Sequence, residues 1–316
     1  MKSSIVTSIL KKIGNEELIE VLANTLTPTD LQSIMLEVYH QKAAKNSPAN
    51  LLRQYVTNRF VQPSYADPKT LAQLKLLAFA YLPKTVNLLE LSPLTPLGNC
   101  SVLATVHQNK VVSTSRNTEV VADATNVLAL ESARQRQLYL KKDAKNASMV
   151  KLCTIHRHTR AQALKESYHT AHFSILCLTT AGRDTGNFKF EYESLLEHLV
   201  YYIQFSKEGL GQQEEDIKIS LTPLTDAGQH LYIRLEEKLK RLFSGVVIEK
   251  DDSRVAGRGY YQSMCFKFKL KKEEDWFEVG DGGFTDWTQQ LLNNKKERFL
   301  GSGLGFELLA KFFFYH

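Results

Sequence analysis

The sequence predicts an α+β fold in which helices pack against a mostly antiparallel sheet. Several strand-like runs are long and alternate between apolar and polar residues, as in 260–270, where Phe266 and Phe268 alternate with Lys267 and Lys269. Such alternation is typical of an antiparallel sheet with one face toward the core. The chain has no P-loop, and no Gly-x-Gly-x-x-Gly follows a strand-like run, which argues against a doubly wound nucleotide-binding fold.

Length and composition are those of an ordinary globular protein. The chain has 316 residues, 43% of them hydrophobic, and its 40 Lys and Arg against 34 Asp and Glu give a formal net charge of +6. The basic residues are spread along the chain, so we do not expect a nucleic acid partner. There is no run of about 18 apolar residues, and the N-terminal apolar stretch is too short and interrupted for a secretion signal. We therefore expect a cytoplasmic protein that does not enter a membrane.

The cysteines indicate a reducing environment. Cys100, Cys153, Cys177 and Cys265 show no zinc-ligand spacing, and three of them lie inside apolar strand-like runs. We expect buried, reduced thiols and no metal site.

Residues 1–87 form a predicted helical region. Thr29-Asp30 precedes an apolar stripe of helical period, and Ser47-Pro48 and Asp67-Pro68 each place a capping side chain before a proline at the first helical position. No catalytic pattern is visible in this region. We expect a helical cap or an interaction module.

Residues 88–316 form the second predicted domain, which carries the sheet. Helices are expected near 125–133, 188–205 and 231–242, with a glycine-rich turn and a helix at the C-terminal end. Strands are expected at 101–106, 110–115, 149–155, 172–180, 217–222, 244–249 and 260–270. We expect four of these strands, at 149–155, 172–180, 217–222 and 260–270, to be adjacent or close in one antiparallel sheet.

Two polar stretches at strand ends could bind a charged ligand. After 149–155, Arg157 and Arg160 could hold a phosphate or carboxylate through two hydrogen bonds each; the alternative is a solvated basic loop. Further upstream, Arg116, Glu119 and Asp123 flank a turn, where the acids could receive an amine or a metal-bound nucleotide. The alternative for the acids is a helix N-terminus stabilised by negative charge.

Glycines and tyrosines mark three further candidate positions. Arg183 follows Gly182 in a turn that closes 172–180, and Arg258 lies just before Tyr260 and Tyr261, whose hydroxyls could line a pocket. The glycine-rich stretches 279–286 and 300–309 could let a planar ligand lie against bare backbone. For each of these, a structural turn or core packing is the alternative.

In this order, the motifs resemble the catalytic domain of class II aminoacyl-tRNA synthetases. The resemblance covers about residues 88–316 and is closest to the histidyl-tRNA synthetase branch and its regulatory paralogue in histidine biosynthesis, the ATP phosphoribosyltransferase regulatory subunit. It rests mainly on 280–283, similar to the family's triple-glycine turn, and on 303–309, similar to the start of its motif 3 helix. It implies a class II synthetase-like sheet flanked by helices.

The resemblance also implies roles for individual residues. Arg157 or Arg160, in the motif 2 region with Gln162, would hold the ATP α-phosphate, and Glu119 or Asp123 would hold a substrate amine. The other residues implied in ligand binding are Arg116, Arg183, Arg258, Tyr260, Tyr261, Gly282, Gly283, Gly303 and Gly305.

The chain departs from the family pattern at several positions. Leu308 stands where the motif 3 arginine holds the ATP γ-phosphate, and an apolar side chain cannot take that role. Lys296 and Arg298, just upstream, are the candidates to replace it. Neither Arg254 nor Arg258 aligns cleanly with the family's arginine before the tyrosines, and no anticodon-binding sequence follows motif 3 within the chain.

These departures favour a binding role over catalysis. We expect a divergent paralogue of the histidyl type that binds an amino-acid or nucleotide-like ligand, ATP or AMP with magnesium among the candidates, in a regulatory or binding role. The alternative is an ATP-dependent ligase that activates a carboxylate or amino acid through an acyl-adenylate. The resemblance also implies a homodimer, paired through the stretch 85–106.

Overall fold

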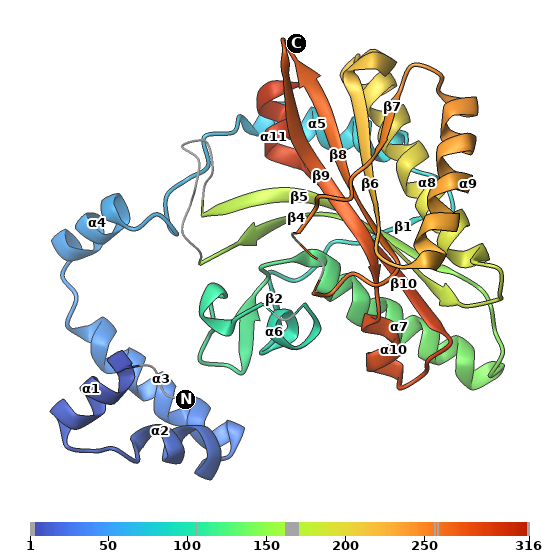
Figure 1. Cartoon of the computed structure of the whole chain (residues 1–316). Coiled ribbons are helices and arrows are strands. Elements are labelled where there is room, and N and C mark those ends of the chain that lie inside the picture. The colour runs from blue at the N-terminus through green and yellow to red at the C-terminus, as the bar shows by residue number, and fades with distance from the viewer. Residues whose placement is uncertain (1–3, 105, 162–170, 256, 258, 315–316) are drawn as a thin grey trace.

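The computed structural model describes residues 4–104, 106–161, 171–255, 257 and 259–314. Its centre is an eight-stranded sheet, in which only the two edge pairs, β1 with β4 and β6 with β7, are parallel (Figure 1). In spatial order the strands are β1 (Asn87–Leu88), β4 (Val150–Thr159), β5 (His172–Arg183), β10 (Glu297–Gly305), β9 (Asp275–Thr285), β8 (Met264–Lys272), β6 (Ile217–Pro223) and β7 (Val247–Lys250). The mostly antiparallel α+β arrangement is confirmed.

Helices cover both faces of this sheet. On one face, α8 (Lys189–Gln204) and α9 (Asp226–Leu242) pack with β8 and β6 in the larger core. On the other face, α7 (Ala124–Lys142) and α10 (Trp287–Leu292) pack with β4, β5 and β10 in a second core. Strand β5 contributes side chains to both cores, because Leu176 and Leu178 belong to the first core while Cys177 and Ala181 belong to the second. All four cysteines are buried and free, as expected.

The N-terminal region is helical, as predicted, and the capping signals at Ser47 and Asp67 are confirmed, whereas Thr29-Asp30 lies inside a helix that Thr27 caps. Its helices are α1 (Ser4–Ile13), α2 (Leu18–Glu20), the π-helical η1 (Val21–Thr25), α3 (Pro28–Ala44), α4 (Pro48–Thr57) and α5 (Pro68–Ala80). The side chains of Thr27, Ser47 and Asp67 each accept a backbone N–H of the following helix, which has proline at its first position. In Figure 1, α1 to α4 lie apart from the sheet, whereas α5 packs into the larger core through Leu74 and Ala78. None of the described helices is long and apolar enough to cross a membrane.

The strands expected at 101–106 and 110–115 are wrong. The first stretch begins in a helix, α6 (Asn99–Leu103), and the second meets a short 3₁₀ turn, η2 (Gln108–Lys110), and a single bridge from Ser113. The cause is a buried carboxylate: Glu119 accepts the N–H groups of Gly98 at 2.8 Å and Cys100 at 3.0 Å, which caps α6. Short strands β2 (Leu94–Pro96) and β3 (Thr118–Val120) form a separate two-stranded sheet beside it.

The glycine-rich turn expected at 279–286 is also wrong, because these residues belong to β9 up to Thr285. A Cβ on Gly282 would lie 2.4 Å from the Cβ of Ser302 and 2.7 Å from the carbonyl oxygen of Gly301, both on β10. The glycine therefore permits close approach of two strands and not a tight turn. The other glycine-rich stretch, 300–309, is a strand that runs into the expected C-terminal helix, because β10 is followed directly by α11 (Phe306–Phe312). The long strand expected at 260–270 begins only at Met264, so the two tyrosines lie in the loop before it.

Candidate functional site

A cavity of about 1120 Å³ lies against the sheet. Its floor consists of glycines on β9 and β10, namely Gly280, Gly283, Gly301 and Gly303, together with Cys177 on β5. Its walls come from the start of α7, the loop before β8, α11 and the segment before α5. Residues far apart in the sequence thus meet at one concave surface, which is the usual setting of a small-molecule site.

Asp123 and Arg160 form a charged pair on one wall of this cavity. Asp123 is the N-cap of α7, and its Oδ1 accepts the N–H of Thr125 at 2.9 Å and the hydroxyl of the same residue at 2.6 Å. Its Oδ2 lies 3.9 Å from Nη2 of Arg160, and both side chains are about one third exposed. Arg160 is held in place by its Nε–H donating to the carbonyl of Ala122 at 3.0 Å and by stacking over Phe173. The wall therefore presents a fixed carboxylate beside a fixed guanidinium.

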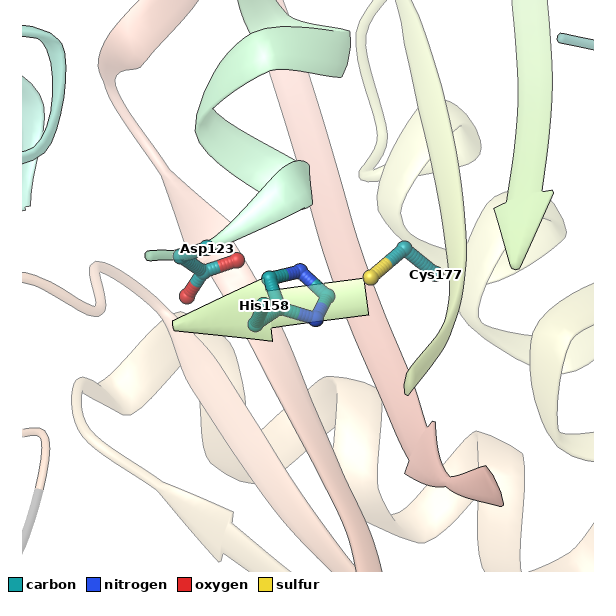
Figure 2. A group of neighbouring side chains, drawn as sticks. All are labelled: Asp123, His158 and Cys177. Atoms are coloured by element: carbon teal, nitrogen blue, oxygen red, sulfur yellow. The ribbon is translucent and has the colours of Figure 1, made fainter. Parts of the chain in front are cut away.

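His158 lies close to Asp123, at the start of α7 (Figure 2). It is fully buried on β4, and its Nε2 accepts the N–H of Ala124 at 2.7 Å, which anchors the first residue of α7. Burial lowers the pKa of His158 to about 3, so the ring stays neutral at physiological pH. A side chain that carries no charge thus anchors the start of α7, next to Asp123.

The same three side chains must be considered as a metal site. One potential ligand atom each from Asp123, His158 and Cys177 lies within 4.8 Å of the others (Figure 2). A neutral imidazole offers only one lone-pair nitrogen, and in His158 that nitrogen already accepts a backbone N–H. Burial also raises the pKa of the Cys177 thiol well above its usual value, which disfavours the thiolate that a metal requires. The hydrogen bonds therefore fit a structural cluster better than a metal site.

An aromatic wall closes another side of the cavity. The rings of Tyr260 and Tyr261 lie 4.3 Å apart, and Tyr260 stacks on Trp287 of α10 at 6.3 Å. Burial raises the pKa of both tyrosines, so both remain protonated and can donate hydrogen bonds. Behind Tyr261, Arg254 is almost fully buried and lies 3.3 Å from Asp281 of β9, which also lines the cavity. Burial raises the pKa of Asp281 in spite of this neighbour.

The structure brings only part of the sequence-predicted site together. The expected residues that line the cavity are Asp123, Arg160, Tyr260, Tyr261, Gly283, Gly303 and Gly305. Of the pair Glu119 and Asp123, only Asp123 presents its carboxylate there, because Glu119 is fully buried as the cap of α6. Gln162 and Arg258 lie outside the described residues.

Four other expected residues do not line the cavity. Arg157 forms an ion pair with Glu307 at 2.7 Å, and Arg183, at the far end of β5, donates to the carbonyl of Ala144. Arg116 is exposed in the turn before β3. A Cβ on Gly282 would lie 2.8 Å from Phe266, which belongs to the core on the α8 side of the sheet. Of Arg157, Arg160, Glu119, Arg183 and Tyr261, which a retained synthetase-like site would bring together, only Arg160 and Tyr261 line the cavity.

Neither proposed replacement for the motif 3 arginine faces the cavity. Arg298 is held by Asp184 at 2.8 Å and Glu191 at 3.0 Å, and Lys296 lies 3.8 Å from Asp184. Leu308 itself lines the cavity, so the motif 3 position presents an apolar side chain there.

Sequence reasoning missed several lining residues. Lys110 and Trp287 follow no binding pattern, and only their place in the fold brings them to the cavity. The segment 64–67 lies more than fifty residues before Asp123 in the sequence and lines the end of the cavity near α11. The N-cap signal at Asp67 predicted a helix start there, but nothing in it pointed to a cavity wall.

Comparison with known proteins identifies the fold. No family model and no curated protein match the chain by sequence. Among solved structures, it is similar to an ATP phosphoribosyltransferase regulatory subunit/histidyl-tRNA synthetase from Bacillus halodurans, with a TM-score of 0.56 and 13% identity over 79% of this chain and 82% of the other. It is similar to the histidyl-tRNA synthetase of S. aureus, with a TM-score of 0.53 and 15% identity over 77% of this chain and 64% of that enzyme.

A third structure agrees with these two. A histidine–tRNA ligase subunit from Alicyclobacillus acidocaldarius gives a TM-score of 0.54 at 8% identity, over 79% of this chain and 95% of that subunit. Identities this low establish the architecture and leave function to be argued from the site. The chain therefore has the class II synthetase-like fold, of the kind found in histidyl-tRNA synthetase and its regulatory-subunit relative.

Proposed function

We propose that the chain binds an amino-acid-like or nucleotide-like small molecule in this cavity and acts in a binding or regulatory role. The observation that carries the proposal is the pairing of Asp123 with Arg160 on one wall, with their charged atoms 3.9 Å apart. A carboxylate beside a guanidinium is complementary to a ligand with an ammonium next to a carboxylate or phosphate. The tyrosine wall and the volume of about 1120 Å³ leave room for the rest of such a ligand.

Two of the described residues argue against adenylate formation in this cavity. Catalysis of that kind relies on cations placed around the phosphates. Here Leu308 occupies the position that the synthetase resemblance gives to a phosphate-binding arginine, and Arg157 is engaged by Glu307. A lost charge-assisted contact corresponds to roughly 1.5–3 kcal/mol, or about ten- to a hundredfold in affinity. We therefore expect AMP to bind at least as well as ATP.

A ligand screen tests this proposal. Thermal shift with ATP, AMP and the twenty amino acids, followed by calorimetry, should find at least one stabilising compound, since a ligand at 100 times its dissociation constant adds about 2.7 kcal/mol. Asp123→Asn should weaken its binding at least about tenfold, because the ammonium loses its charged partner. The matched control is Asp275→Asn, at the exposed start of β9. If no compound binds, or if Asp123→Asn binds like the wild type, the proposal fails.

The competing ligase reading has its own assay. Amino-acid-dependent exchange of pyrophosphate into ATP would show that an acyl-adenylate forms. That result would favour the ligase over the binding role. We expect no exchange above background.

We also propose that the chain forms a homodimer through the stretch 85–106. Large apolar side chains are exposed along it: Leu88 is 48% exposed, Leu94 39%, Leu97 45% and Val102 70%. Exposed apolar side chains that lie together favour burial against a second protein surface. The solved structure from Bacillus halodurans is described as a regulatory subunit, which agrees with a role in an assembly.

A further inference from the structure

The segment that joins α4 to α5, residues 58–67, forms one end of the cavity wall. Ser64, Tyr65, Ala66 and Asp67 all line the cavity, as do glycines of β10. We term residues 58–67 the strap. It lies near the start of α11, where Glu307 and Leu308 also line the cavity.

A closed circuit of polar contacts fixes the strap to the body. The Ser64 hydroxyl donates to Oε2 of Glu307 at 3.0 Å, and the other oxygen of Glu307 lies 2.7 Å from Nη2 of Arg157. Arg157 in turn donates to Nδ1 of His172 at 2.8 Å. Because arginine can only donate, Nδ1 is the acceptor and Nε2 carries the proton, which it donates to the carbonyl of Gln62 at 2.6 Å. The circuit thus begins and ends on the strap.

Each member of this circuit comes from a different element. Arg157 lies on β4, His172 begins β5 and Glu307 is in the first turn of α11. The strap itself contributes one side chain and one backbone carbonyl. These two contacts attach it at two points, two residues apart.

Part of the strap is exposed to solvent. Tyr65 is 92% exposed and Val61 50%, so these two side chains contribute little buried apolar area. Segments held at the surface by polar contacts open locally at low free energy. Beyond it, α1 to α4 lie away from the sheet (Figure 1). Because the strap joins α4 to α5, a displacement of those helices would pull on the cavity wall.

We propose that the strap acts as a latch: it closes the cavity and is released when the Ser64–Glu307 and His172–Gln62 contacts break. Movement of the helices α1 to α4 displaces the strap. The latch controls entry to the cavity whatever the ligand is, so this inference does not depend on the proposed function. It assigns Arg157 and Glu307 to holding the wall closed.

Cys177 provides a reporter that needs no ligand. It is the cysteine on the cavity floor, only 1% exposed, while the other three are buried elsewhere. Its modification by N-ethylmaleimide, followed by peptide mass spectrometry, measures how often the cavity admits a small reagent. Deuterium uptake by the amides of residues 60–66 measures release of the strap itself.

Two variants break the circuit at different points. Ser64→Ala removes one attachment and His172→Ala removes the other, and each should raise both the labelling rate of Cys177 and the strap exchange about tenfold, equivalent to about 1.4 kcal/mol. Ser253→Ala and His230→Ala, two changes at exposed positions outside the cavity wall, are the matched controls and should behave as the wild type.

The two readouts separate the ways in which the inference could fail. If the strap exchanges faster while Cys177 is labelled at the wild-type rate, the strap does not control entry. If neither readout changes in either variant, the circuit does not hold the strap. A variant with reduced helicity by circular dichroism is set aside, and the other variant then decides.

Discussion

Acid should destabilise this protein through His198, a histidine buried between α8 and the sheet. Its Nδ1 bonds to the hydroxyl of Ser302 at 2.8 Å and its Nε2 to that of Thr180 at 3.0 Å, and the ring is fully buried. Tyr202 completes the network through the same serine at 2.7 Å. Hydroxyls can serve as donor to one ring nitrogen and acceptor from the other, so the network satisfies a neutral ring.

Burial lowers the pKa of His198 to about 3, against about 6.5 in an unfolded chain. Between these two values the unfolded chain binds a proton that the folded chain does not, so stability is complete above pH 6.5 and falls as the pH falls toward 3. From about pH 7.5 to about pH 5, this one group lowers the free energy of unfolding by about 2 kcal/mol. His158, whose pKa is also about 3, adds a similar loss in the same direction.

The His198→Gln variant isolates the contribution of His198. Glutamine keeps a donor and an acceptor but does not titrate, so the variant should lose about 2 kcal/mol less than the wild type between the two pH values. Urea unfolding, followed by the fluorescence of the two tryptophans, gives the free energy of unfolding of the wild type and of the variant at each pH. The loss through His158 is common to both proteins and cancels. His230→Gln, on an exposed position of α9, is the control. Equal losses in wild type and His198→Gln would refute the reasoning.

Three further predictions follow from packing, charge and assembly. Gly282→Ala should cost about 1–3 kcal/mol by urea unfolding, since its Cβ would lie 2.4 Å from that of Ser302, whereas Gly259→Ala, with open space around it, should not. Arg136→Met should lower the free energy of unfolding by about 3–5 kcal/mol, because Glu297, which is fully buried and lies 2.8 Å from Arg136 in the wild type, would lose its cation. Adding Glu297→Leu should recover most of that loss. Val102→Asp should convert the proposed dimer to monomers in light scattering, and a wild type that shows only a 35.9 kDa species would contradict the dimer.

Periodicity in the sequence predicted most of the fold. The strands at 149–155, 172–180 and 217–222, and the helices that follow Ser47 and Asp67, are present because apolar period and capping side chains act locally. The errors arose where a distant group decides the outcome. SVLATV at 101–106 has strand propensity, yet its first residues are helical because a carboxylate about twenty residues away caps α6.

The site was less predictable than the fold. Asp123 and Arg160 were each one of two candidates, and local sequence gave no means to choose between Asp123 and Glu119 or between Arg160 and Arg157. The choice depends on which side chains are already occupied: Glu119 by two backbone amides, and Arg157 by Glu307. Such occupancy is a long-range property, because the partner Glu307 lies 150 residues from Arg157 in the sequence.

The bare floor of the cavity limits how its selectivity can change. Gly280, Gly283, Gly301 and Gly303 offer a ligand only backbone, and at Gly280 a Cβ would lie 2.6 Å from the carbonyl oxygen of Gly303. Substitution of Gly280 would therefore disturb the pairing of β9 with β10 before it altered ligand preference. New specificities are accessible mainly through the walls, where the α7 cap, the tyrosine loop and the strap belong to separate elements. A designer could vary these three independently over a floor that remains constant.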